Sequence, residues 1–154
     1  YTTLFRSLFM PRPPVLIGGY VDAVLKRAGT MGDGWLTYFY TPESFTRSWG
    51  KVKAFAREAG RDPATLTATN QLAVYVGRSR EETTAAMRQW LSTEWDTAAW
   101  SESTIDHAVH GSVSDCIEQL RAHVKTGVHR IILIPYRYQP EQVERIAKEV
   151  LPKL

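Results

Sequence analysis

The sequence predicts an α/β protein made of four βα units with parallel strands. Short apolar runs, of the kind that are buried on both faces of a parallel sheet, alternate with segments in which apolar residues recur at helical spacing. Each of the four runs precedes a helical segment, and this order favours parallel strands joined by right-handed crossovers. The 154 residues, 44% of them hydrophobic and 23% charged, are typical of one globular domain with its own core.

The first two units occupy the amino-terminal part of the chain. A strand over residues 15–17 is followed by a helix over residues 21–28, and a second strand is predicted over residues 34–38. The second helix begins after Thr41, a capping residue that precedes a proline at the first helical position. Gly60 is predicted to end this helix.

The third unit has the longest strand, predicted over residues 66–76. Ser79 and Glu82 have the spacing of a capping box and open a helix that runs through Leu91. Residues 93–110 then form a less regular connection, rich in tryptophan, serine and acidic residues, and no strand is predicted in it.

The fourth unit begins with a second capping box. Ser112 and Asp115 open its helix, Gly127 stops it, and the last strand covers residues 130–134 before a closing helix over residues 139–151. A doubly wound sheet and a (β/α)8 barrel share this local pattern. Four units amount to a small open sheet or to half of a barrel, which needs about 250 residues when complete. The pattern by itself leaves both architectures open.

Composition and charge exclude several classes of function. The net charge is +3, but the basic residues are scattered, whereas a nucleic-acid surface concentrates them on one face. No apolar run approaches the length of a membrane span, and no signal peptide is recognised. The single cysteine, Cys116, excludes an internal disulfide and fits a reducing, cytoplasmic compartment. The chain begins with tyrosine instead of methionine, so a piece of a longer protein is expected.

No metal centre or hydrolytic triad is predicted. His107 and His110 lie three residues apart in the irregular connection, and His123 and His129 flank a helix end, without a third ligand at metal-binding spacing. No nucleophile elbow accompanies them. Cys116 falls on the inward face of the fourth helix and is predicted to fill the core.

Gly18 and Gly19 are the first functional candidates. They end an apolar strand and open a helix, and in parallel sheets ligands bind at the carboxyl ends of the strands. Without Cβ atoms these residues allow the backbone to approach an anion, with the amides of Gly19 and Tyr20 directed at it. The alternative is a glycine pair that serves only a tight turn. Asp33, at the opposite end of the sheet, is predicted to hold a turn.

Six motifs stand in the order and at the spacing of a known family: Pro14–Gly19, Ala28–Leu36, Thr41–Glu43, Ala56–Pro63, Gly111–Asp115 and Gly127–Leu133. On these motifs the chain resembles the carboxyl-terminal half of the bacterial luciferase-like monooxygenases, which are flavin- or coenzyme F-420-dependent (β/α)8 barrels. The resemblance implies that the four strands are barrel strands five to eight and that residues 14–154 form a half-barrel. It also implies that residues 1–13 are the end of the insertion before strand five, and that the family's first four strands are absent.

The resemblance further implies a cofactor, either reduced FMN reacting with oxygen or coenzyme F-420 transferring hydride. In the family, the turn at Gly18 and Gly19, together with Tyr20, holds the cofactor phosphate. Thr37 and Tyr38 line the cofactor or substrate pocket, where a hydroxyl would hydrogen-bond the phosphate or the rim of the ring. The alternative is that Tyr38, Phe39 and Tyr40 only pack the top of the barrel.

Arg137 is the candidate for substrate binding. It lies between two tyrosines after the last strand, and a guanidinium group binds anions in a bidentate way and stacks on aromatic rings. An anionic small-molecule substrate or a phosphate group is therefore expected there. A solvated loop charge is the alternative, for Arg137 and equally for Arg78.

Two functions remain in view. In the first, the parent protein is a monooxygenase or oxidoreductase to which this half contributes the phosphate site. Because the family's residues near the reacting ring come largely from the first four strands, no catalytic residue is assigned and the chain alone is expected to be inactive. In the second, the chain is a non-catalytic assembly module. Its open sheet edges at residues 15–17 and 130–134 would pair with a second copy, giving a homo-oligomer, or with a separate amino-terminal half.

Overall fold

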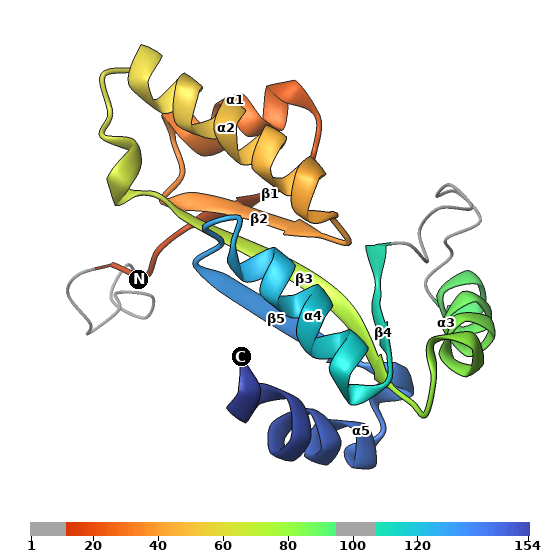
Figure 1. The fold of residues 1–154 in the computed structure, drawn as a ribbon. Helices are drawn as coiled ribbons and strands as arrows, with labels where there is room; N and C mark the ends of the chain where they lie inside the picture. The colour runs from red at the N-terminus through yellow and green to blue at the C-terminus, as the bar shows by residue number, and fades with distance from the viewer. Residues whose placement is uncertain (1–11, 95–106) are drawn as a thin grey trace, which may run out of the picture.

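A parallel sheet forms the centre of the molecule, as the alternating pattern predicts. The structure, a computed structural model, describes residues 12–94 and 107–154. Within them the sheet has five strands (Figure 1): β1 (Leu16–Gly18), β2 (Gly34–Tyr38), β3 (Thr67–Val76), β4 (Val109–Gly111) and β5 (Arg130–Pro135). All strand pairs are parallel, with β1 next to β2, β2 next to β3, and β3 next to both β4 and β5. The predicted α/β class with parallel strands is confirmed.

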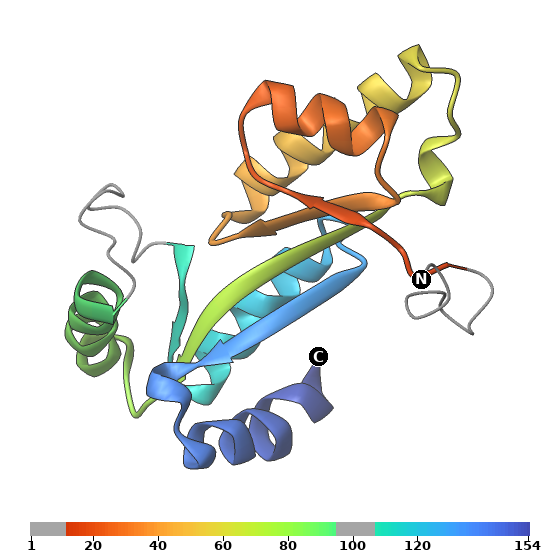
Figure 2. The ribbon, with the colours of Figure 1, turned by 180° about the vertical axis from the view of Figure 1, so that it is seen from behind.

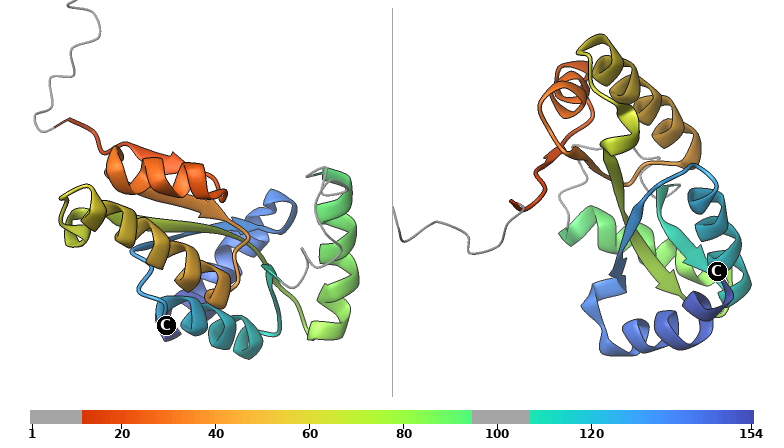
Figure 3. Two further views of the ribbon diagram at one scale, coloured as in Figure 1. Left: turned by 90° about the horizontal axis from the view of Figure 1, so that it is seen from above. Right: turned by 90° about the vertical axis from the view of Figure 1, so that its left-hand side faces the viewer.

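The helices connect these strands in the expected order. They are α1 (Asp22–Thr30), α2 (Pro42–Glu58), α3 (Arg80–Glu94), α4 (Val113–Val124) and α5 (Pro140–Arg145), with a short 3-10 turn at Pro63–Thr65. In the right-hand view of Figure 3, α1, α2, α4 and α5 form an arc around the sheet. Helix α3 stands apart, at the carboxyl end of β3 (Figure 3). The sheet is open, consistent with half of a barrel.

The side chains of the strands point alternately to two faces of the sheet, of which one is packed against helices. On β3, Ala68 is buried among residues of α1 and α2, whereas Leu72 and Val74 are buried among residues of α4 and the closing helix. Because side chains alternate along a strand, Gln71 and Tyr75 point to the other face. Figure 2 views the molecule from this side, with β3 and β5 in front of α4. We call this side of the sheet the open face.

The helix boundaries follow the capping signals of the sequence. The Thr41 side chain accepts a hydrogen bond from the Ser44 amide, and Pro42 stands at the first helical position. Ser112 and Asp115 form both hydrogen bonds of a capping box. At α3 only half of the predicted box forms, since Ser79 Oγ accepts from the Glu82 amide while the Glu82 carboxylate accepts from the amide of Arg78.

Two sequence predictions were wrong in detail. The connection over residues 93–110 was predicted without a strand, but it ends in β4, whose three residues are too few to show a period. Strand β4 is held by polar contacts of His110, whose Nδ1 lies 3.0 Å from Thr83 Oγ1 and whose main chain bonds to the Gln119 amide. The closing helix is α-helical only to Arg145 and continues as a π-helical turn (Ile146–Val150) and a 3-10 turn (Leu151–Lys153).

The side chain of Gln142 completes one edge of β3. It accepts a hydrogen bond from the Val76 amide (2.9 Å) and donates one to the Val76 carbonyl (3.2 Å). Strand β5 reaches only as far as Val74, which pairs with Pro135. Gln142 is 7% exposed. Its carboxamide bonds to the Val76 main chain where a longer β5 would have done so.

Close packing of α1 on α2 depends on Gly29, and this contact gives a first testable prediction. A Cβ atom on Gly29 would lie 2.5 Å from the Val52 carbonyl oxygen and 3.0 Å from the Ala56 amide nitrogen. We expect Gly29→Ala to lower the free energy of unfolding by about 1–3 kcal/mol, because the two backbones must separate. Urea denaturation measures the change.

Gly50 offers a matched control on α2. A Cβ atom there meets nothing within 4 Å, so Gly50→Ala should raise stability by about 0.5–1 kcal/mol, as expected for an exposed helix interior. Equal effects of the two substitutions would contradict the prediction.

Candidate functional site

Several residues with positive φ angles lie at the carboxyl ends of the strands. Among the described residues, every non-glycine residue with positive φ lies there: Phe39 after β2 (53°), and Arg137 (47°) and Tyr138 (54°) after β5. Gly19 after β1 has φ 134°. Such conformations cost free energy and cluster where ligands bind. This end of the sheet is therefore the candidate functional site.

The turn after β1 requires glycine at position 19. A Cβ atom on Gly19 would lie 2.9 Å from Cγ1 of Val24 in α1, in addition to the cost of the positive φ. The Gly19 amide donates to the Leu36 carbonyl at 3.3 Å. This differs from the sequence expectation that the Gly19 amide faces an anion, because the sheet ladder already uses it. Gly18, the last residue of β1, is exposed.

The amino terminus of α1 supplies free amides next to this turn. Val21 caps the helix without a side-chain hydrogen bond, and its carbonyl accepts from the amides of Val24 and Leu25. No group in residues 12–94 or 107–154 accepts a hydrogen bond from the amides of residues 20–23. Amides at a helix amino terminus attract anions. The carboxylate of Asp22 in the first turn is paired with Lys51 at 2.7 Å, which offsets its negative charge.

Thr37 presents an unpaired hydroxyl on the same face of the sheet. Its side chain is 1% exposed, and its Oγ1 has no hydrogen-bond partner in the described part of the chain. An unpaired buried hydroxyl costs about 1–3 kcal/mol. Since Gly18 pairs with Leu36, the turn that follows Gly18 runs beside Thr37. A ligand oxygen in this position would accept the hydrogen bond that the Thr37 hydroxyl otherwise lacks.

Trp35 ties the turn to β2. Its side chain is fully buried, and Nε1 donates to the Gly19 carbonyl at 2.6 Å. Trp35 and Thr37 are two residues apart on one strand, so both point toward α1 and α2. Sequence reasoning missed this role of Trp35, although the alternation along β2 placed it on the same face as Thr37.

Tyr38 points to the opposite face. It is half-buried on the open face, with its ring 6.0 Å from that of Phe39 in an edge-on contact. Tyr20 is 60% exposed beside the turn. Gly19 and Tyr20 thus follow β1 next to the end of β2, where Gly18 pairs with Leu36, and Tyr38 points to the opposite face from Thr37.

Arg137 lies across β2 and β3 from the turn. Its guanidinium carbon is 5.4 Å from the centre of the Tyr136 ring, and its Nε is 4.0 Å from the Glu94 carboxylate. Arg137 follows β5 and Gly19 follows β1, and β2 and β3 lie between these two strands. Arg137 and Gly19 therefore do not form one cluster. Arg78 is 90% exposed and paired with Glu82 one helical turn away, as a solvated charge would be.

An aromatic cluster that sequence reasoning missed covers this end of the sheet. Tyr136 stacks on Tyr75 with ring centres 4.2 Å apart, and Trp90 of α3 meets Tyr136 edge-on at 5.3 Å. His107 Nδ1 is hydrogen-bonded to the Phe39 carbonyl. The signal in the sequence was the pair of tyrosines around Arg137, but their contact with α3 depends on the fold.

Two other residues singled out in the sequence, Asp33 and Cys116, stabilise the fold. Asp33 accepts two hydrogen bonds from Arg12 and one from the Val15 amide, which confirms its turn-holding role, and these bonds lower the pKa of its carboxyl group. Cys116 is buried, and burial raises the pKa of its thiol to about 12. The tryptophans Trp95 and Trp100 of the connection over residues 93–110 lie outside the described residues.

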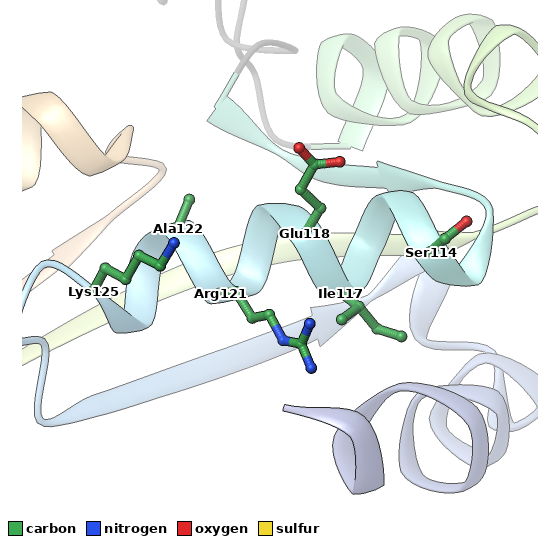
Figure 4. A pocket seen from close by; sticks show the side chains of 6 residues that line it. All are labelled: Ser114, Ile117, Glu118, Arg121, Ala122 and Lys125. Carbon is green, nitrogen blue, oxygen red and sulfur yellow. The ribbon is translucent and has the colours of Figure 1, made fainter.

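Three further observations bound the site. The surface hollow of Figure 4 is lined by five residues of α4 and by Lys125 directly after it, and contains none of the predicted site residues. The five are Ser114, Ile117, Glu118, Arg121 and Ala122. In residues 12–94 and 107–154 no group of three or more histidine, cysteine, aspartate or glutamate side chains could hold a metal ion. No helix in the same ranges is long and apolar enough to cross a membrane.

Comparison with known proteins agrees with this architecture. The phthiodiolone/phenolphthiodiolone dimycocerosates ketoreductase of Mycobacterium tuberculosis is 24% identical over 115 residues, which cover 70% of this chain and 30% of that protein. The structure of an F-420-dependent secondary alcohol dehydrogenase, solved with an F-420–acetone adduct, superposes with a TM-score of 0.74 at 18% identity. The match covers 92% of this chain and 49% of that one.

A second solved structure binds FMN. The oxygenating constituent of 3,6-diketocamphane monooxygenase from Pseudomonas putida superposes with a TM-score of 0.64 at 17% identity, over 89% of this chain and 47% of that one. This chain therefore spans about half the length of such structures, and about a third of the curated relative. The family model of the luciferase-like monooxygenases matches residues 1–130 of the 154, and the chain belongs to that family.

Proposed function

We propose that this chain supplies the cofactor-phosphate site of an oxidoreductase that uses FMN or coenzyme F-420. The observation that carries the proposal is the unpaired, buried hydroxyl of Thr37 on β2, the strand that pairs with β1, together with the amino terminus of α1 after β1, which has no side-chain cap. Family membership and structural relatives that bind F-420 or FMN support it. Both cofactors carry a phosphate group on the chain attached to the ring, so one anion site suits either.

The residues present fit a phosphate. The amides of residues 20–23 and the Thr37 hydroxyl are donors, and a phosphate oxygen is an acceptor. The turn that presents these amides needs glycine at position 19, because a Cβ atom there would collide with Val24. Lys51 reduces the repulsion from Asp22. The amides and the Thr37 hydroxyl therefore supply hydrogen-bond donors, and the one carboxylate in the first turn of α1, that of Asp22, is paired with Lys51.

In this proposal the chain binds and orients, and the cofactor supplies hydride transfer or reduced-flavin chemistry when bound. Tyr38 would face the ring side of the pocket from the open face, and Arg137 would bind an anionic group of a small-molecule substrate. We assign no catalytic residue to this chain and propose that it is inactive alone. Turnover of a substrate panel by the isolated chain, with reduced FMN or reduced F-420, would contradict that part. A cytoplasmic location is proposed with it, in keeping with a free buried thiol.

The test compares ligands with and without phosphate. We expect Thr37→Val to weaken FMN binding about tenfold, the loss of roughly one hydrogen bond to a charged group, and to leave riboflavin binding unchanged. Fluorescence titration measures both affinities, and the same pair of titrations applies to F-420 and its dephosphorylated form. Because the substitution removes an unpaired buried hydroxyl, thermal stability should rise or stay constant.

Thr46→Val is the matched control, since its hydroxyl donates to the Pro42 carbonyl on the exposed side of α2. It should change neither affinity. Equal losses for FMN and riboflavin in Thr37→Val, or no loss for either, would show that Thr37 does not contact phosphate.

A further inference from the structure

Asn70 of β3 carries a second buried polar atom without a partner. The residue is 1% exposed, and in the described part of the chain its side-chain carbonyl oxygen, Oδ1, accepts no hydrogen bond. Its amide nitrogen, Nδ2, donates to the Tyr40 carbonyl at 3.2 Å. This bond fixes the orientation of the carboxamide, because the flipped arrangement would bring two carbonyl oxygens together. Oδ1 therefore lacks a hydrogen-bond donor.

Asn70 and Thr37 are neighbours in the sheet. They are paired residues of β3 and β2, so their side chains point to the same face, and both are buried. On the other side of Asn70, the paired residue of β5 is Ile131, whose side chain has no polar atom. Two unmatched groups of different kinds therefore lie side by side: a hydroxyl that can donate a hydrogen bond, and a carbonyl oxygen that can only accept one.

A phosphate group alone does not match this pair of groups. A phosphate monoester is mostly a dianion at pH 7, and a phosphodiester carries no proton, so the oxygens of both accept hydrogen bonds and do not donate them. Phosphate oxygens therefore suit the Thr37 hydroxyl and are repelled by Oδ1 of Asn70. A ligand that matches both groups carries a donor close to its phosphate, and a hydroxyl is the simplest such donor.

We propose that Asn70 accepts a hydrogen bond from a hydroxyl group of the cofactor side chain, next to the phosphate that Thr37 contacts. The inference rests on the proposed function, since FMN and F-420 both carry hydroxyl groups on the chain that joins the ring to the phosphate. Asn70 then selects phosphates on a polyol chain over phosphates on a plain alkyl chain. Tyr40 supports this role, because its carbonyl holds the carboxamide of Asn70 in place.

The experiment compares four flavins that differ in the chain attached to the ring. FMN carries hydroxyls and a phosphate, and riboflavin carries hydroxyls alone. A flavin with an unsubstituted alkyl chain ending in phosphate carries the phosphate alone, and lumiflavin carries neither group. Fluorescence titration of the protein measures the four affinities. We expect FMN to bind about tenfold more tightly than the alkyl phosphate, the effect of roughly one hydrogen bond to a buried group. The same four chains on a deazaflavin ring extend the test to the ring of F-420.

Two substitutions of Asn70 separate a direct contact from a structural effect. Asn70→Leu removes the acceptor, so the preference for FMN over the alkyl phosphate, and for riboflavin over lumiflavin, should disappear. Asn70→Asp keeps an acceptor and adds a negative charge, so it should retain the preference for riboflavin over lumiflavin while weakening the binding of both phosphates. Loss of the bond to Tyr40 would weaken all four ligands alike and leave these ratios unchanged. Thr37→Val is the matched control, since it should weaken only the two phosphates.

The hydroxyl contact and the phosphate site fail in different ways. If FMN and the alkyl phosphate bind the wild-type protein equally, and both more tightly than riboflavin, the phosphate site stands and the inference is overturned, with a buried water as the donor to Asn70. Ratios that Asn70→Leu leaves unchanged would overturn it as well. If FMN binds no more tightly than riboflavin, but riboflavin is preferred to lumiflavin, the phosphate site fails and the hydroxyl contact remains. Binding of none of these ligands would overturn both.

Discussion

Replacing Trp35 with alanine is expected to lower the free energy of unfolding by about 3–5 kcal/mol. The side chain is fully buried, and its ring contacts those of Tyr40 at 5.4 Å and Phe45 at 5.3 Å. The substitution removes this packing and also the donor that the Gly19 carbonyl uses. Equilibrium denaturation in urea measures the loss. A change below 1 kcal/mol would show that the contacts between α2 and β2 are loosely packed.

Trp35→Phe separates packing from hydrogen bonding. It keeps most of the apolar surface and removes the indole N–H, so we expect a smaller loss of about 1–2 kcal/mol. Since Trp35 holds the Gly19 turn, this variant should also weaken FMN binding more than riboflavin binding. Trp90→Phe, in the other aromatic cluster, is the control and should leave that ratio unchanged.

Acid is expected to destabilise the fold through His123. The side chain is 5% exposed, and burial lowers its pKa from 6.5 to about 4, with the nearby Glu43 carboxylate opposing the shift. Between these two values the unfolded chain binds the proton and the folded chain does not. Stability from this group is therefore complete above pH 6.5 and falls as the pH drops toward 4, by about 3 kcal/mol in total.

His123→Leu tests this assignment. The variant cannot titrate at this position, so the difference in unfolding free energy between wild type and variant should change by about 3 kcal/mol between pH 7 and pH 4. Urea denaturation at a series of pH values provides both curves, and the subtraction cancels the carboxylates common to the two proteins. Parallel curves would assign the acid sensitivity to other groups.

Helix starts were predictable because they depend on neighbouring residues. Thr41 with Pro42, and Ser112 with Asp115, form their caps within four residues of chain, and the structure contains both. The glycine turn after β1 was found for the same reason. Strand β4 was not, since its three residues are held by Thr83 and Gln119, which lie far from it or on the next helix.

The site was only partly predictable, because it depends on strand order and on which face each side chain takes. Thr37 and Tyr38 are adjacent in sequence but lie on opposite faces of β2. Arg137 follows a strand that lies on the far side of β3, a fact that no local pattern contains. The hydrogen bond from Trp35 to Gly19 spans 16 positions and required the pairing of β1 with β2.

The contact between Gln142 and Val76 has a consequence for self-association. Where β5 stops, a carboxamide from the closing helix imitates one more peptide unit and occupies the main-chain groups of Val76. A neighbouring molecule cannot dock a strand against that stretch without first displacing the helix. The closing helix therefore covers a stretch of β3 whose main-chain groups would otherwise be open to an added strand.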